Sequence, residues 1–454
     1  MGALVNNSSY SVRAFTRRLA DDTVLNTLAG KGLSALLIKI VTAGLTFAVF
    51  VLLARWLGPD AYGRYAIYFS LGTFLGFVCV GGLHTLVLRK LPALDTPESA
   101  GPAVALVRDG YQALGLLGLL LIFGSGAIGL VGALMGITAW APIIAMALAL
   151  PFALAEYQSH VLRGWSSINL ALLPRDVIWR LAVIAVIGAL MAFDVTLNAG
   201  VAFAWTCGLL AGLVLIQFLI GLKRAPEGGL TKLCASAPTP LATLIEARWL
   251  AAAALAGAML AQLSVVLVGA VLTAVDAGAF FASQRTSTLL ALPLIAANMI
   301  GAPMIARAWA AGDLAQVQRI CSLIVIGLTL PTLAGLVLFA LAGGWILSLF
   351  DPSYAVHKPI LLIFATGALV NALCGPTGFL MLMTGHERQF VKILAVSQGI
   401  GLGLVALGAT TFGLAGAALG EAVGMALWNI LIWRWARQQL GVDPTVAGLG
   451  RTTT

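Results

Sequence analysis

The chain has 454 residues, of which 60% are hydrophobic and only 9% are charged, and its mean hydropathy is +1.01. A soluble domain carries roughly 25% charged residues, so this composition excludes an ordinary soluble protein. The formal charge of +9 would favour a nucleic-acid partner in a soluble chain. Here the basic residues lie in short segments between apolar runs, which is the positive-inside pattern of a membrane protein, and no nucleic-acid partner is predicted.

Twelve apolar runs are long enough to cross a bilayer, for which roughly 20 residues are needed. They lie near 33–54, 65–88, 110–133, 140–162, 176–193, 198–222, 248–271, 279–306, 320–342, 358–382, 391–411 and 414–436. The predicted fold class is therefore an all-α polytopic membrane protein with about 12 transmembrane helices.

A polar, Pro- and Gly-bearing segment divides the chain, with six predicted spans before it and six after it. Because six is even, both halves enter the membrane in the same orientation, which predicts two pseudo-symmetric lobes with a cavity between them. Lys and Arg gather on one side of the spans, so both termini are predicted to be cytoplasmic. The predicted parts are a cytoplasmic arm (1–30), a first lobe (31–222), a cytoplasmic linker (223–240), a second lobe (241–437) and a cytoplasmic tail (438–454).

The first span carries a basic residue, Lys39, on one polar or small face that also includes Thr42. Ionisable residues within a membrane span are costly and are therefore candidates for function. One reading turns this face, and Lys39 with it, toward an aqueous cavity. The alternative is that Lys39 extends to the cytoplasmic interface, as long basic side chains do.

The eighth span begins with six polar residues, 283–288, which include Gln284 and Arg285. Lipid cannot satisfy such a run, whereas a water-filled cavity can. Arg285 is therefore predicted to face the cavity, and the alternative is an arginine at the outer interface that binds a lipid headgroup. Arg180, near the inner end of span five, is expected to extend to the interface.

Two carboxylates lie within predicted spans. Glu156 closes the fourth span and either pairs with Arg163 or serves as a protonation site. Glu421 lies deeper, on a helix face of small residues, where it either packs on a neighbouring helix or couples transport to an ion. Gln262 and Asn298 are uncharged polar groups in mid-span and favour hydrogen bonds between helices.

Motifs of soluble enzymes are absent from the sequence. It contains no P-loop, no HExxH and no GxSxG motif, and its four histidines and five cysteines lack ligand spacing. No catalytic residue, metal site or cofactor is therefore predicted, and the chain is expected not to be an enzyme. Transport would have to be driven by an ion gradient, the membrane potential or consumption of the substrate.

Four segments, in order along the chain, resemble bacterial polysaccharide flippases of the O-antigen type, within the multidrug, oligosaccharidyl-lipid and polysaccharide exporter superfamily. The segments are 51–65 (VLLARWLGPDAYGRY), 277–285 (AGAFFASQR), 382–388 (LMTGHER) and 413–418 (GLAGAA). The resemblance covers roughly residues 30–440 and implies two six-helix lobes that alternate between inward-open and outward-open states.

The resemblance also implies a substrate and a location. The substrate would be an undecaprenyl diphosphate-linked oligosaccharide, moved from the inner to the outer leaflet of the bacterial inner membrane during synthesis of O-antigen, capsule or exopolysaccharide. By resemblance, Lys39 and Arg285 match basic positions that bind this substrate in the lumen. The other partners implied are membrane lipid and a polysaccharide polymerase and copolymerase.

Three other functions remain open at this stage. A cation-coupled multidrug antiporter of the same superfamily would usually carry buried carboxylates in its first lobe, and spans one to three have none in their middles. A lipid II flippase would differ only in the glycan. A membrane glycan polymerase would normally present a large periplasmic loop, whereas the predicted outside loops are short.

Overall fold

The computed structural model describes residues 22–94, 100–135, 140–165, 168–195, 197–223 and 239–448, and within them every regular element is a helix. Of the predicted arm, residues 1–21 lie outside this description, as do residues 224–238 of the predicted linker and residues 449–454 of the predicted tail. The first described helix begins at Asp22, inside the predicted arm.

Helices of the first half form one lobe. They are α2 (Asp22–Val80), α3 (Leu83–Lys90), α4 (Ala100–Leu134), α5 (Ala141–Trp165), α6 (Ile168–Leu173), η3 (Pro174–Ile178), α7 (Trp179–Ala192) and α8 (Ala199–Lys223). Helices of the second half form the other lobe. They are α10 (Pro240–Val271), α11 (Ala274–Ser287), η4 (Thr288–Ala291), α12 (Leu292–Ala310), α13 (Leu314–Ser348), η5 (Pro352–His357), α14 (Lys358–Cys374), α15 (Thr377–Met383) and α16 (Glu387–Gln439).

The prediction of about twelve crossings in two lobes is confirmed. Within the described residues, eight helices are long and apolar enough to cross a membrane. Two of them contain a glycine outside the helical region, Gly58 (φ 74°) in α2 and Gly413 (φ 61°) in α16, and each therefore covers two predicted spans. The predicted spans 176–193 and 279–306 correspond to helices interrupted by η3 and η4. Large apolar side chains such as Phe123, Leu341 and Phe412 are exposed, as a lipid-facing surface requires.

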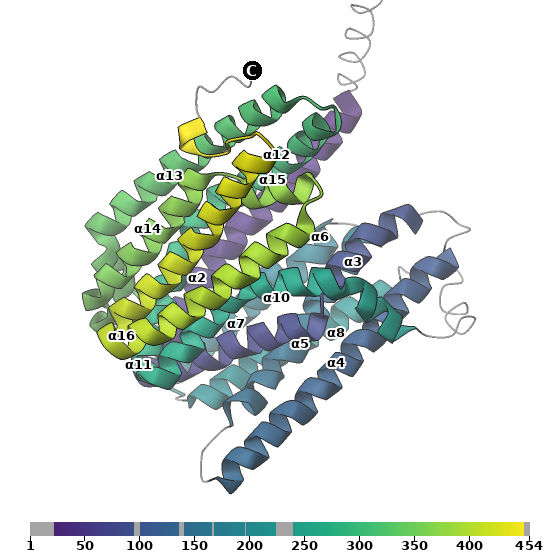
Figure 1. The fold of residues 1–454 in the computed structure, drawn as a ribbon. Coiled ribbons are helices and arrows are strands. Elements are labelled where there is room, and N and C mark those ends of the chain that lie inside the picture. The colour runs from purple at the N-terminus through teal and green to yellow at the C-terminus, as the bar shows by residue number, and fades with distance from the viewer. Residues whose placement is uncertain are drawn as a thin grey trace, which may run out of the picture.

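Figure 1 shows the two lobes meeting beside α11 and the bend of α16 and diverging toward α3 and α12. Helix α2 joins the lobes, because it packs against α5 of its own lobe and against α10 and α11 of the other. We call the end of the molecule near Gly58 and Ala274 the joined end, and the end near Lys90 and Glu387 the far end.

Contacts between the lobes are closest at the joined end. The Arg55 Nε donates a hydrogen bond of 2.6 Å to the Leu349 carbonyl, and the Phe47 and Phe350 rings meet edge to face at 5.3 Å. Near the far end the lobes are linked by two exposed ion pairs, Arg89–Glu387 and Lys90–Glu246, and α10 also packs against α3 and α4 of the first lobe. Exposed ion pairs contribute little stability, so the contacts at the joined end and the packing of α10 on the first lobe hold the lobes together.

Candidate functional site

A cavity of about 320 Å³ lies between the lobes. The first lobe contributes Glu156, Arg175 and Arg180, and the second contributes Gln262 and Arg285. The remaining wall is mostly aromatic and apolar: Phe50, Phe69, Phe77, Leu148, Phe152, Trp179 and Leu210, together with the hydroxyls of Thr46 and Thr73. Apolar walls with a few polar groups are typical of a ligand-binding cavity.

Arg285 reaches the cavity from α11 and is held in a defined position. One of its Nη atoms donates a hydrogen bond of 3.0 Å to Gln262 Oε1 on α10. Its guanidinium lies 4.7 Å from the Phe281 ring centroid and about 6 Å from those of Phe50 and Phe69, so cation–π attraction fixes the group among three rings. The Arg285 Nε is buried without a hydrogen-bond partner, and a buried donor without a partner is costly.

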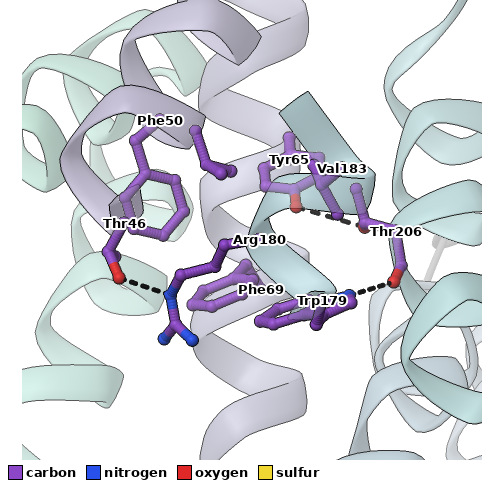
Figure 2. Close-up of a pocket in the computed structure, with 9 residues that line it drawn as sticks. Thr46, Phe50, Tyr65, Phe69, Trp179, Arg180, Val183 and Thr206 are labelled. Atoms are coloured by element: carbon purple, nitrogen blue, oxygen red, sulfur yellow. Dashed lines mark hydrogen bonds between the residues drawn. The ribbon is translucent and has the colours of Figure 1, made fainter. Parts of the chain in front are cut away.

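Arg180 reaches the cavity from α7, beside a smaller pocket of the first lobe (Figure 2). Its Nε donates to Thr46 Oγ1 at 2.5 Å, and one Nη donates to the carbonyls of Arg175 and Asp176 at 2.9 and 2.8 Å. The neighbouring Trp179 donates its indole N–H to the Thr206 carbonyl at 3.0 Å. These bonds fix the orientation of both side chains relative to α2 and α8.

Arg175 belongs to η3, a π-helical turn between α6 and α7. Its guanidinium pairs with the Glu156 carboxylate of α5 and, through Nε at 3.1 Å, with Asp176 Oδ1. Asp176, which is 2% exposed, also accepts a 2.7 Å bond from Lys39 Nζ of α2. Glu156, Arg175, Asp176 and Lys39 thus form a line of alternating charges, which we call the ionic chain, and its Glu156–Arg175 end lines the cavity.

The charge of the cavity wall is positive. Three arginines and one carboxylate line it, which gives +3 − 1 = +2. Guanidinium groups pair with phosphates and carboxylates through parallel hydrogen bonds, and such bonds are strong in a cavity with apolar walls. The arrangement is therefore suited to an anionic ligand.

The sequence-predicted site residues take three positions. Arg285, Gln262 and Glu156 line the cavity, whereas Lys39 lies outside the wall in its pair with Asp176. Thr42 bonds to the Ile38 carbonyl of its own helix. Gln284 and Glu421 lie behind the cavity, buried and joined by a 2.7 Å bond from Gln284 Nε2 to Glu421 Oε1. The side chain of Asn298 falls outside the described residues.

Two arginines of the wall were missed by the sequence analysis. Arg175 falls between the predicted spans 140–162 and 176–193, and Arg180 is predicted to extend to the interface. Both predictions are wrong, because the helix runs from α6 through η3 into α7 and carries these residues inside it. The expected pairing of Glu156 with Arg163 is replaced by pairing with Arg175. The segment Pro174-Arg-Asp176 was the available signal, since a charged pair after a helical proline can mark a local change of helix geometry.

Comparison with known proteins matches the fold and leaves the family open. No family model and no curated protein sequence matches the chain. Solved structures do match. An inward-facing multidrug resistance MATE family transporter of the MOP superfamily superimposes with a TM-score of 0.71 and 14% identity, over 90% of this chain and 98% of that one. The chain has the MATE-transporter fold.

Two further solved structures, one in an outward-facing conformation and one with a reversed pocket polarity, also share the fold. An outward-facing MATE family transporter gives a TM-score of 0.60 with 15% identity, over 91% of this chain and 95% of that one. A MOP superfamily transporter from Pyrococcus furiosus, for which a reversed polarity of the binding pocket suggests a different function, gives 0.62 with 16% identity, over 91% and 95%.

Proposed function

We propose that this MATE-fold chain is a flippase that moves an undecaprenyl diphosphate-linked oligosaccharide from the inner to the outer leaflet of a bacterial inner membrane. The observation that carries the proposal is the cavity wall, in which Arg175, Arg180 and Arg285 face a single carboxylate. A diphosphate is the part of such a substrate that carries negative charge, and guanidinium groups are its natural partners.

The residues around the arginines support this reading. Arg285 is held by Gln262 and by three aromatic rings, and Arg180 by Thr46 and two carbonyls, so neither group must be ordered when the ligand arrives. Preorganised donors lose little entropy on binding. The isoprenoid chain is too long for a cavity of about 320 Å³, and it would remain in the surrounding lipid while the headgroup crosses.

Synthesis of a surface polysaccharide gives the proposal its cellular setting. The polymer would be O-antigen, capsule or exopolysaccharide, and a polymerase and copolymerase would act on the flipped substrate. Both chain ends would be cytoplasmic, which makes the joined end periplasmic and places the diphosphate near the ionic chain when it enters.

A multidrug antiporter is the second candidate, because the solved structures that share the fold include multidrug resistance transporters. An organic cation would need a cavity in which negative charge dominates. The wall has the opposite sign, with one carboxylate that is already paired to Arg175. The charge therefore favours the flippase.

A deletion strain tests the proposal directly. We expect lipid-linked oligosaccharide to accumulate on the inner face of the membrane and surface polymer to be lost, and the wild-type gene to restore both. Arg285→Ala should fail to restore export, whereas Arg437→Ala, a change at an exposed arginine far from the cavity, should succeed. An unchanged lipid-linked pool together with increased sensitivity to cationic dyes would reject the flippase and support the antiporter.

A further inference from the structure

Behind the cavity, the first lobe brings two histidines and a carboxylate together from two helices. His84 lies on α3, and Glu156 and His160 lie one turn apart on α5. One ligand atom of each residue lies within 4.8 Å of the corresponding atoms of the other two. The two imidazole rings meet nearly edge to face, with centroids 4.9 Å apart.

In each of the two histidines at least one ring nitrogen is left free to bind a metal ion. His160 Nδ1 lies 2.8 Å from the Glu156 backbone carbonyl, and because a carbonyl only accepts, this nitrogen carries the proton. The other ring nitrogen of a neutral His160 then has a free lone pair, which is the arrangement that orients metal-bound histidines. His84 is 8% exposed, and its Nδ1 has no hydrogen-bond partner.

The backbone places His84 at this position. Gly81 and Gly82 adopt positive φ angles of 49° and 72° and end α2, so that α3 starts in a new direction. A side chain at position 82 would collide with the Ala251 backbone nitrogen at 2.3 Å. The turn therefore requires glycine at position 82, and it directs His84 toward α5.

We infer that His84, Glu156 and His160 form a binding site for a divalent transition-metal cation such as Zn²⁺. Two imidazoles and one carboxylate are a ligand set that this class of cation takes, with a fourth position left for water. Metal–ligand distances of about 2.0–2.2 Å place neighbouring ligands about 3.3 Å apart, so small rotamer changes bring the three atoms onto one ion.

Glu156 connects this site to the cavity. Its Oε2 pairs with Arg175, while its Oε1 lies 3.8 Å from His160 Nδ1. A cation bound by the histidines competes with Arg175 for the carboxylate. Arg175 keeps its second partner, Asp176, so its charge stays balanced. Metal binding would therefore weaken the Glu156–Arg175 pair and release Arg175 toward an anion in the cavity.

Metal binding to the purified full-length protein tests the site without any transport substrate, and so separately from the proposed function. The protein, free of a polyhistidine tag, is dialysed against Zn²⁺, and bound metal is measured by mass spectrometry, with affinity from competition with a chelating dye. We expect one Zn²⁺ per chain. His84→Gln and His160→Gln should each weaken binding by at least about tenfold, and His357→Gln, in η5 of the other lobe, should not.

Two further measurements keep the test valid even if the histidine variants do not fold. Co²⁺ added to the wild-type protein should give the visible absorption of a low-coordinate nitrogen and oxygen site. Arg163→Gln should tighten binding severalfold, since this guanidinium acts electrostatically on both histidines. Absence of stoichiometric Zn²⁺ from the wild type, or equal binding by wild type and both histidine variants, would overturn the inference.

Discussion

Gly63 of α2 and Ala274 of α11 approach so closely that no side chain fits between them. An ideal Cβ at position 63 would lie 1.7 Å from the Ala274 carbonyl oxygen. The same helix faces also meet at Gly278, whose Cβ would lie 3.3 Å from the Gly63 Cα. These residues belong to different lobes, so their contact holds the two lobes in close backbone contact at the joined end.

A side chain at position 63 should therefore open the joined end. We expect Gly63→Val to expose Phe350, which is fully buried beside this contact. The measurement is the reaction of Phe350→Cys with a membrane-impermeant maleimide in a cysteine-free background, which should be several times faster in the Gly63→Val protein. Gly44→Val is the matched control, because open space surrounds Gly44 on the same helix. Equal labelling of both proteins would contradict the prediction that the Gly63–Ala274 contact keeps Phe350 buried.

Lys39 provides a second test, since the structure gives it a stabilising role. Lys39→Met should lower the thermal unfolding temperature by a few degrees, because Asp176 is nearly fully buried and loses one of its two cationic partners. The exchange Lys39→Asp with Asp176→Lys should recover part of the loss. Unchanged unfolding of Lys39→Met together with lost substrate binding would instead favour the role that the resemblance implies.

Arg180 should not be replaceable by lysine. Its planar guanidinium bonds to Thr46 and to two carbonyls of η3 at once, and an ammonium group cannot span the three positions. We expect Arg180→Lys to reduce flipping in proteoliposomes by roughly tenfold, the effect of losing one or two charge-assisted hydrogen bonds. Thr46→Val removes one bond only and should cost less. Wild-type flipping by Arg180→Lys would mean that charge alone is needed there.

Glu421 should tolerate loss of its charge. It is 3% exposed, and a glutamine would still accept the hydrogen bond from Gln284. Because an uncompensated buried carboxylate is costly, we expect Glu421→Gln to unfold at the same temperature or higher and to flip substrate normally. Glu421→Leu removes the acceptor, leaves the Gln284 amide with one partner fewer, and should lower the unfolding temperature. Lost flipping in a stable Glu421→Gln protein would point to ion coupling instead.

The sequence was sufficient for the crossings because lipid imposes a simple rule: a long apolar run must satisfy its own backbone as a helix. Span ends were harder to place. The span predicted at 176–193 belongs to a helix that extends back through η3 to Ile168, past a proline and two charged residues. Hydropathy alone leaves Arg175 outside the span and starts the span at Asp176, because it does not register that Glu156 and Lys39 on other helices neutralise these two charges.

Of the charged and amide side chains in the cavity wall, the sequence predicted Glu156, Gln262 and Arg285 and did not predict Arg175 and Arg180. Arg285 stands in a polar run that lipid could not accommodate, so its place in the cavity could be predicted from the sequence. The meeting of His84 and His160 could not, because it depends on the turn at Gly81 and Gly82 and on the packing of α3 against α5. Helix-to-helix contacts of this kind leave no spacing pattern along the chain.

The π-helical turn η3 offers related proteins a way to change the charge of their cavity walls. Each residue of an α-helix turns the chain by about 100°, so a one-residue deletion within Pro174–Ile178 would rotate α6 relative to α7 without altering either helix. Arg175 would swing out of line with Arg180, and the wall would lose a positive charge although no arginine had been replaced. Relatives that differ only in the length of this turn could thus recognise ligands of different charge. A sequence alignment that places the one-residue gap outside the turn would hide this change.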